Sequence, residues 1–360
     1  MCMGTRGGPA AFDPPVVSID DFDYDLPPEL IAQEPLPERD ASRLLVLDRA
    51  TGEVRHHVFR DLPGLLRAGD LVVVNRSRVF PARLIGTRAG GGAAEVLLLR
   101  RTGEDDWEAL VRPARRLRPG ACVRISDGLE VEILEGPVLA DGRRRVRLLA
   151  RSGDAAAEIE RLGHMPLPPY IRRADQPADR VRYQTIYARE AGSVAAPTAG
   201  LHFTAALLAG LEERGVERAE VVLHVGPGTF RPVQVQDVRD HTVPAEPYLV
   251  PAETAAAIAR ARARAGRVVA VGTTTTRVLE ARAAESGGVA AGEGETALVI
   301  VPGFPFRTVD ALVTNFHLPR SSLLLLVSAF AGRERILAAY AEAVRLGYRF
   351  YSYGDAMLVV

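Results

Sequence analysis

The sequence contains no lysine, so all 45 of its Lys and Arg positions are arginine. A lysine Schiff base is therefore excluded, and with it pyridoxal phosphate chemistry and lysine-dependent aldol chemistry. The formal net charge is zero, which argues against a protein that coats nucleic acid through charge alone. Two classes of function are thus set aside before any motif is considered.

Cysteine and long apolar runs are also scarce. Cys2 and Cys122 lie far apart and outside any CxxC or Cys/His pattern, so neither a disulfide framework nor a structural zinc site is expected. The seven histidines show no HExxH spacing, and no metal is predicted. Residues 1–18 lack a signal-peptide core, and no apolar run approaches membrane-spanning length. We therefore expect a disordered leader over 1–18 and a cytoplasmic protein.

At 360 residues the chain is longer than a single core usually grows, so two domains are expected. Between residues 69 and 164, short alternating segments are separated by turn residues, which is typical of a small antiparallel β-barrel. The strands expected there are 71–74, 82–86, 94–99, 107–111, 121–125, 129–134 and 145–149.

The rest of the chain, 19–68 and 165–360, is predicted to form an α/β core that carries catalysis, because its later part alternates strands with helices. Thr204 is a plausible N-cap, and Gly215 a plausible stop, for one of these helices. The expected helices are 205–214, 253–265, 276–285, 321–330 and 333–346, and the expected strands are 219–225, 267–271, 296–301 and 309–313. The predicted fold class is a mixed α/β core domain with an inserted small antiparallel β-barrel domain.

Two short, uncharged loops of Gly, Thr, Ser, Pro and His, 192–204 and 224–230, lie beside apolar runs, where backbone N–H groups and small hydroxyls can approach a ligand. Three further segments bring the candidate ligand loops to five. The 272–277 loop follows a predicted strand and opens a helix, so it suits a carboxylate or phosphate. It lacks the P-loop and dinucleotide spacings, which disfavours an NTPase, a dehydrogenase and a Rossmann methyltransferase. The alternative is a helix start capped by Thr273 and Thr274. The five loops are 192–204, 224–230, 272–277, 314–319 and 353–357.

Histidines and acids near these loops are the acid–base candidates. His202, His224 and His317 each lie beside an apolar run, and we expect at least one in the site because α/β sites gather at strand ends. The alternative for each is a hydrogen bond inside the core. Asp355 precedes an apolar tail and is expected to be partly buried, with a turn-capping role as the alternative. For Glu246 the alternative is a solvent-facing loop acid.

Two arginine-rich segments are candidates for contact with RNA, because guanidinium groups fork onto phosphates and stack on bases. One is a turn of the predicted barrel, for which a solvated rim is the alternative. The other follows a proline-stiffened stretch at 163–171, where cations interleaved with tyrosines suit looped RNA; an interdomain hinge is its alternative. The tRNA-binding candidates are Arg112, Arg115, Arg116, Arg172, Arg173, Arg182 and Tyr183.

Motifs spread from residue 21 to the end of the chain resemble the S-adenosylmethionine:tRNA ribosyltransferase-isomerase family of queuosine biosynthesis. The resemblance lies in segments 21–27, 42–45, 79–84, 165–171, 183–185, 193–204, 224–230, 270–274, 314–319 and 348–357. It implies that the ribosyl unit of S-adenosylmethionine is transferred and isomerised onto 7-aminomethyl-7-deazaguanine at the tRNA wobble position. Epoxyqueuosine-tRNA, adenine and methionine would be the products.

The resemblance also implies an α/β domain with a β-barrel insertion, and no cofactor beyond S-adenosylmethionine as co-substrate. A monomer that binds tRNA and no membrane is expected. Such a site must keep the acceptor amine neutral, remove a proton beside the sulfonium and neutralise the adenine leaving group. The catalytic candidates are His202, His317, Glu246 and Asp355. The substrate-binding candidates are Thr198, Gly200, Phe203, His224, Gly226, Gly228, Thr229, Gly272, Thr273, Thr274, Arg277, Asn315 and Tyr353.

The sequence departs from the family pattern in two places. Val243 and Pro244 stand where a Met–His pair is usual, and Arg76 stands where a second Asn or Asp is usual. Loss of that histidine leaves two readings: Glu246 carries the function, or the protein is a paralogous adenosylmethionine-dependent enzyme with another acceptor. A non-catalytic arginine-rich RNA-binding protein is a further alternative, against which the neutral charge and uncharged loops count.

Overall fold

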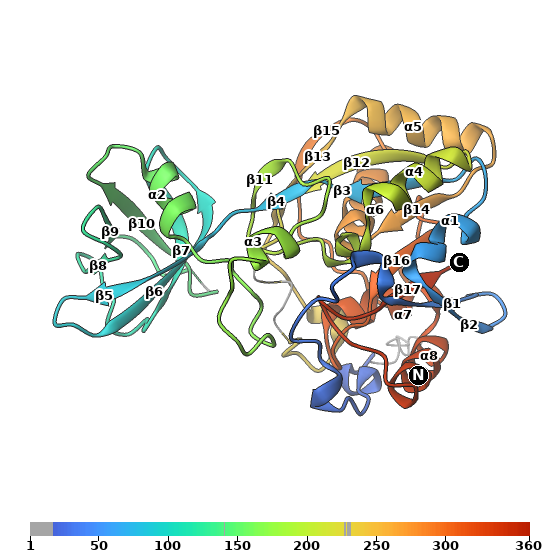
Figure 1. Cartoon of the computed structure of the whole chain (residues 1–360), viewed down its shortest axis with the longest axis horizontal. Helices are drawn as coiled ribbons and strands as arrows, with labels where there is room; N and C mark the ends of the chain where they lie inside the picture. The colour runs from blue at the N-terminus through green and yellow to red at the C-terminus, as the bar shows by residue number, and fades with distance from the viewer. Residues whose placement is uncertain (1–16, 140, 227, 229–231) are drawn as a thin grey trace, which may run out of the picture.

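The computed structural model describes residues 17–139, 141–226, 228 and 232–360. A layered α/β core carries a smaller β-barrel that extends from it along the long axis of the molecule (Figure 1). The predicted fold class is confirmed. Nearly all of the predicted leader, 1–18, falls outside the described residues.

The core is built on a 9-stranded sheet with the order β15-β13-β12-β3-β14-β16-β17-β1-β2. Strands β12, β3, β14 and β16 run parallel, whereas β13 is antiparallel to β12 and β17 is antiparallel to β16. The strands are β1 (Arg43–Leu47), β2 (Val54–Val58), β3 (Leu71–Asn75), β12 (Glu217–Leu223), β13 (Glu246–Val250), β14 (Val268–Val271), β15 (Gly292–Thr296), β16 (Ala311–Asn315) and β17 (Ala356–Val359).

Helices cover both faces of this sheet, because alternate strand residues point to opposite sides. In β1, Leu44 and Val46 pack on the face covered by α1 (Leu62–Leu65) and α4 (Ala205–Glu213). Leu45 and Leu47 pack on the opposite face, which is covered by α5 (Ala252–Ala263), α6 (Thr273–Ser286), α7 (Ser322–Ala331) and α8 (Arg333–Arg345). The predicted cap of α4 is confirmed, since Thr204 Oγ1 accepts a hydrogen bond from the Leu207 amide at 3.2 Å.

The barrel closes in the order β10-β7-β6-β5-β8-β9, with α2 (Ala155–Leu162) following its last strand. Its strands are β5 (Arg83–Arg88), β6 (Ala93–Arg101), β7 (Asp106–Arg112), β8 (Cys122–Arg124), β9 (Leu129–Ile133) and β10 (Arg144–Ala150). They match every predicted barrel strand except 71–74. That expectation is wrong, because β3 is buried on both faces in the middle of the core sheet. Otherwise the predicted boundaries, 1–18, 19–68 with 165–360, and 69–164, stay a prediction.

The strand predicted at 296–301 is also wrong over most of its length, since β15 ends at Thr296. The Leu298 amide turns back to Thr296 Oγ1 at 3.1 Å. Such a local side-chain bond competes with the strand ladder and ends it.

Short elements complete the fold. β4 (Ser77–Val79) and β11 (Glu190–Ser193) pair in parallel where the chain passes between barrel and core, next to α3 (Asp179–Arg182). The 3₁₀ turns are η1 (Ile19–Phe22), η2 (Pro28–Leu30), η3 (Arg39–Ala41), η4 (Phe59–Asp61), η5 (Thr198–His202) and η7 (Val238–Asp240). Within the described ranges, no helix has the length and apolar character needed to span a bilayer.

Candidate functional site

Strand direction brings most of the candidate residues to one side of the core sheet, the side on which its parallel strands end. His224 follows β12, Gly272 follows β14 and Asn315 ends β16, and these parallel strands finish on the same side. The antiparallel neighbours begin there, so Glu246 opens β13 and Asp355 immediately precedes β17. This is the edge at which open α/β sheets usually bind ligands.

A small cavity at this edge joins several of the predicted loops, and we call it the loop pocket. Its volume is about 40 Å³. It lies where 196–199, 272–274, 314–317 and 351–352 meet, loops that are far apart in the sequence. The described residues that line it are Tyr170, Ala196, Pro197, Thr198, Ala199, Val225, Gly272, Thr273, Thr274, Thr314, Asn315, His317, Leu323, Tyr351 and Ser352.

The first turn of α6 faces the loop pocket without a cap. Gly272 turns the chain from β14 into α6 with a φ of +92°, a conformation that favours glycine. No side chain caps the helix, so the amides of its first turn lack an internal acceptor. The expectation that Thr273 and Thr274 cap this helix is therefore wrong. Thr275 Oγ1 donates to the Val271 carbonyl at 2.8 Å, whereas the buried Thr274 Oγ1 has no partner among the described residues.

His202 lies behind the loop pocket, with both ring nitrogens in hydrogen bonds. Asn315 Nδ2 lies 3.1 Å from Nε2, and Ser42 Oγ lies 2.6 Å from Nδ1. An amide nitrogen can only donate, so Nε2 accepts and Nδ1 carries the proton. The ring also stacks on Phe59, with centroids 4.8 Å apart. Burial lowers the pKa of His202 to about 3, and the imidazole is therefore neutral at neutral pH.

His317 lines the loop pocket itself. Its Nε2 lies 2.8 Å from Thr314 Oγ1, and burial lowers its pKa to about 3. The third candidate, His224, lines none of the cavities described here; burial lowers its pKa as well, and its Nδ1 has no partner among the described residues. Of the three, His317 is thus the best placed to touch a ligand.

A larger cavity lies between the core and the barrel, and we call it the interdomain pocket. Its volume is about 230 Å³. The core contributes Gly226, Gly228, Val243, Pro244, Ala245, Glu246, Pro247 and Glu295, and the barrel contributes Leu99, Arg100, Leu110, Asp141 and Arg143. Val243 and Pro244, two of the three positions expected to depart from the family pattern, thus lie in its wall.

Glu246 and Arg277 form a buried ion pair beside the interdomain pocket. Glu246 Oε2 lies 2.5 Å from Arg277 Nη1, and Oε1 accepts the Gly226 amide at 2.7 Å. Arg277 Nε donates to the Leu298 carbonyl at 2.9 Å. Both side chains are less than a tenth exposed, so the alternative of a solvent-facing Glu246 is wrong. The pair ties α6 and β13 to the loop that begins at Gly226.

The loop pocket and the interdomain pocket lie on either side of one chain segment. Val225 lines the first and Gly226 the second. A third cavity of about 20 Å³ shares Leu323 with the loop pocket and Val243 with the interdomain pocket. The three cavities are therefore neighbours, with Val225, Gly226, Val243 and Leu323 in the walls between them.

The Asp355 carboxylate is bound by other groups of the protein. It accepts the amides of Arg43 and Arg349 at 2.9 and 2.8 Å, and the Arg43 guanidinium binds Oδ2 at 3.0 and 3.1 Å. Three of these contacts are on Oδ2 and one is on Oδ1, so both carboxylate oxygens are already engaged inside the fold. The side chain lines none of the cavities described here, and the geometry favours a structural role that joins the start of β17 to the start of β1.

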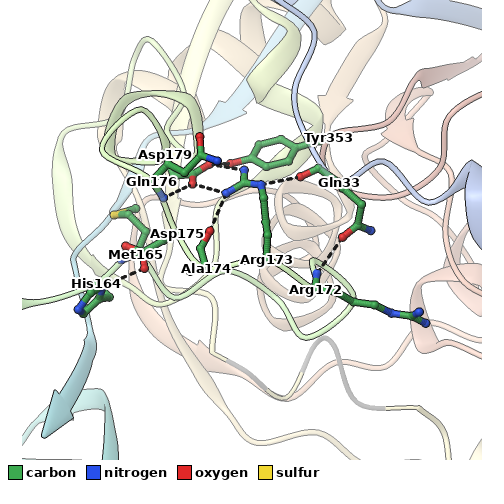
Figure 2. Close-up of polar contacts among 10 residues, drawn as sticks. All are labelled: Gln33, His164, Met165, Arg172, Arg173, Ala174, Asp175, Gln176, Asp179 and Tyr353. Atoms are coloured by element: carbon green, nitrogen blue, oxygen red, sulfur yellow. Dashed lines mark hydrogen bonds and ion pairs between the residues drawn. The ribbon is translucent and has the colours of Figure 1, made fainter.

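Arg173, which the sequence predicted to bind tRNA, belongs to a network of hydrogen bonds inside the protein (Figure 2). Arg173 binds the buried Asp179 through two bonds of 2.7 and 2.9 Å, and Tyr353 donates to the same carboxylate at 2.8 Å. Arg182 donates to two backbone carbonyls. Tyr183 is 0% exposed and offers no ring face to a base, which corrects the expectation that it stacks on RNA.

Arg112, Arg115, Arg116 and Arg172 have the opposite surroundings. All four are exposed, and none of their guanidinium groups has a partner within the described part of the chain. They are free to meet an external anion.

The remaining candidates divide between core and cavity. Phe203 is fully buried between Phe59 and Tyr187, and Gly200 packs so closely on the Tyr187 hydroxyl that a Cβ would collide with it. Tyr353 lines a cavity of about 20 Å³ together with His202. Thr229 lies outside the described residues.

Sequence reasoning missed several residues that the structure puts at the site. Ser42 Oγ accepts a hydrogen bond from Nδ1 of His202, although only its place in a family-like segment could have pointed to it. Tyr170, Thr314, Tyr351 and Ser352 line the loop pocket, and the last two directly precede a predicted loop. Among the described residues, no cluster of His, Cys, Asp and Glu is suited to a metal ion.

Comparison with known proteins places this geometry in context. The profile of the family described as "Queuosine biosynthesis protein" matches residues 19–359. A protein of Moorella thermoacetica named S-adenosylmethionine:tRNA ribosyltransferase-isomerase is 56% identical over 343 residues, which cover 95% of this chain and 99% of that protein. A protein of the same name from Desulfitobacterium hafniense is 52% identical over 346 residues, covering 96% and 100%.

A solved structure is similar as well. It is the crystal structure of S-adenosylmethionine tRNA ribosyltransferase from Thermotoga maritima, with 41% sequence identity and a TM-score of 0.55. The likeness covers 94% of this chain and 100% of that one. Fold and sequence therefore agree in what they resemble.

Proposed function

The chain belongs to the family of queuosine biosynthesis proteins, and we propose that it is an S-adenosylmethionine:tRNA ribosyltransferase-isomerase. It transfers and isomerises the ribosyl unit of S-adenosylmethionine onto 7-aminomethyl-7-deazaguanine at the tRNA wobble position, and releases adenine and methionine. The observation that carries the proposal is the convergence of uncharged loops from four parts of the chain at one sheet edge.

We assign the two substrates to neighbouring cavities. The loop pocket, at about 40 Å³, holds only part of adenosylmethionine. The rest extends past Val225 and Gly226 towards the interdomain pocket, which at about 230 Å³ is the larger. Because the interdomain pocket is lined by both core and barrel, it suits a base presented by a macromolecule that lies across both.

The residues at these cavities mainly position the reactants. The sulfonium of adenosylmethionine stabilises a neighbouring carbanion, so the protein needs alignment and a proton acceptor rather than a strong nucleophile. Burial lowers the pKa of His317 to about 3, so its imidazole stays neutral and orients a reactant by hydrogen bonding, since a base this weak does not take up a proton readily. Glu246, which the Arg277 guanidinium holds in place, accepts a hydrogen bond from the Gly226 amide at the interdomain pocket, where a shift would misalign the acceptor.

The tRNA contact is assigned to the unpaired arginines, Arg112, Arg115 and Arg116 on the barrel and Arg172 on the core. Guanidinium groups without internal partners can bind phosphates at no cost to the fold. We further propose that the protein acts as a cytoplasmic monomer and uses no cofactor beyond adenosylmethionine.

The test is product analysis with adenosylmethionine and a tRNA that carries 7-aminomethyl-7-deazaguanine. We expect adenine and methionine in equal amounts and a ribosyl-modified tRNA, and no release with a tRNA that has guanine at the wobble position. Tight tRNA binding without turnover would favour a non-catalytic RNA-binding protein. Adenine release that does not depend on this tRNA would favour a paralogue with another acceptor.

A further inference from the structure

Residues that line the loop pocket carry both unused donors and an unused acceptor. The donors are the uncapped amides of the first turn of α6, a helix of 14 residues, and the hydroxyl of Thr274. The acceptor is Asn315 Oδ1, which has no partner among the described residues. Thr274 and Asn315 are 7% and 3% exposed, so both unpartnered groups belong to side chains that are more than nine-tenths buried.

The orientation of Asn315 is fixed by its neighbours. Its Nδ2 lies 3.2 Å from the Tyr351 carbonyl, 3.4 Å from the Asp355 carbonyl and 3.1 Å from His202 Nε2. Backbone carbonyls only accept hydrogen bonds, so the amide nitrogen must lie on this side. The oxygen is therefore the atom left without a donor, and a buried acceptor in that state is costly unless a ligand supplies one.

The charge of the loop pocket limits what it can hold. None of the described residues that line it is Asp, Glu or Arg, and its His317 is neutral because burial lowers its pKa to about 3. A phosphate dianion would need a cation to offset its burial. A zwitterion carries no net charge, and its two ends require the donors and the acceptor that are present.

The size of the pocket supports the same choice. A cavity needs roughly 10–15 Å³ for each water-sized group that it holds. The loop pocket, with about 40 Å³, therefore holds about three such groups. The two carboxylate oxygens and the ammonium nitrogen of an amino-acid end are three such groups. A purine ring is larger.

We propose that the loop pocket binds the amino-acid end of adenosylmethionine. The carboxylate accepts from the first-turn amides of α6 and from the Thr274 hydroxyl, and the ammonium donates to Asn315 Oδ1. His202 acts on this site as a positioning residue, because it holds the amide group of Asn315. The inference rests on the proposed function, since it assumes that adenosylmethionine is the ligand.

The test compares three ligands by isothermal titration calorimetry on the full chain: adenosylmethionine, its decarboxylated analogue and its deaminated analogue. Hydrogen bonds to charged groups are stronger than neutral ones, so we expect each analogue to bind at least about tenfold more weakly. Thr274→Val removes the hydroxyl and keeps the side-chain shape. It should weaken adenosylmethionine about tenfold, leave the decarboxylated analogue unchanged and so reduce the preference between them.

Thr275→Val is the matched control. It is the same substitution at the next position of α6, but its hydroxyl already bonds inside the helix and it does not line the loop pocket. We expect the control to keep the wild-type preference among the three ligands, whatever its effect on stability.

The outcomes separate this inference from the proposed function. If wild type binds all three ligands equally, or if Thr274→Val weakens adenosylmethionine and the decarboxylated analogue alike, the amino-acid site is rejected. Turnover of the precursor tRNA in the same preparation would then leave the proposed function standing. If wild type binds none of the three and shows no turnover, both are rejected.

Discussion

Arginines of the core and arginines of the barrel turn have the same side chain and opposite surroundings. Arg173 and Arg277 each bind a carboxylate that is less than a tenth exposed. Arg112, Arg115 and Arg116 are exposed, and no described residue pairs with them. A guanidinium that neutralises a buried carboxylate cannot be released to a ligand, because the carboxylate would be left buried and unpaired. The unpaired groups are the ones available to phosphates.

The contrast has a cause in the composition. Because the chain has no lysine, structural pairing and anion binding both fall to arginine, and residue type alone does not separate the two tasks. The partner decides, and it is often distant in sequence: Arg43 pairs with Asp355, and Arg277 with Glu246. Breaking pairs in the core and removing free groups on the barrel should therefore have different consequences.

The largest expected effect concerns two histidines of the core, which burial keeps neutral. Burial lowers the pKa of His202 and His317 to about 3, below the unfolded value of about 6.5. As pH falls below 6.5 the unfolded chain binds protons first, so this part of the stability is complete above pH 6.5 and is lost as pH falls towards 3. Between pH 7 and pH 5 we expect about 2 kcal/mol per histidine, or about 4 kcal/mol together.

Urea unfolding at pH 7, 6 and 5 measures this loss. His202→Gln should remove about half of the pH-dependent loss attributed to the two histidines, whatever it does to the stability at pH 7. A variant with the same pH dependence as wild type would show that His202 is not kept neutral in the folded protein.

The next effect comes from breaking a core pair. Arg173→Gln leaves the Asp179 carboxylate, which is 3% exposed, without its guanidinium. Removing one partner of a buried pair typically costs about 3–5 kcal/mol, and we expect the lower end because Tyr353 and the Gln176 amide still donate. Urea unfolding at pH 7 checks it. Arg172→Gln is the adjacent control and should stay within about 0.5 kcal/mol of wild type; equal losses would contradict the contrast.

Glu246→Gln should lower turnover in the folded protein. The substitution keeps an oxygen for the Gly226 amide but leaves Arg277 without its counter-charge. Because small misplacements at a reaction centre can cost about 100-fold, we expect kcat/KM to fall by that order. Glu293→Gln, an exposed position on β15, is the control. Wild-type kcat/KM in a folded Glu246→Gln variant would remove the pair from the site.

Local patterns in the sequence predicted most of the elements correctly. The alternation of the barrel strands and the cap at Thr204 depend on neighbouring residues, and both are confirmed. The prediction that 71–74 belongs to the barrel was wrong because β3 is buried on both faces. The pattern of a continuous apolar run does not indicate which sheet the strand joins. Its partners, β12 and β14, lie far along the chain.

The candidate site was less predictable for the same reason. Loops at strand ends could be recognised, and those around Thr274, Asn315 and His317 do line one cavity. Whether a polar group already has partners depends on distant contacts. Three hydrogen bonds from Arg43 and Arg349 and an ion-pair contact with Arg43 hold the Asp355 carboxylate, and the residues next to Asp355 in the sequence do not predict them. Whether a side chain already has hydrogen-bond partners, rather than its residue type, therefore separates structural groups from groups that can bind a ligand.

The smallest expected effect is on the barrel, and it sharpens the contrast most directly. Each lost phosphate contact makes the dependence of log K on log salt less steep by about 0.7–0.9. Replacing Arg115 and Arg116 together by serine should therefore weaken tRNA about 10- to 30-fold at 0.15 M salt and change the slope by about 1.4–1.8. Folding should be unaffected, because neither guanidinium has a partner among the described residues. Titrations of tRNA at several salt concentrations measure both quantities.

The control replaces Arg260 and Arg345, paired arginines on core helices, by serine. It removes the same charge and should leave the slope unchanged. If this core variant changes the slope and the barrel variant does not, tRNA is held by paired arginines, and an internal partner would no longer mark an arginine as structural.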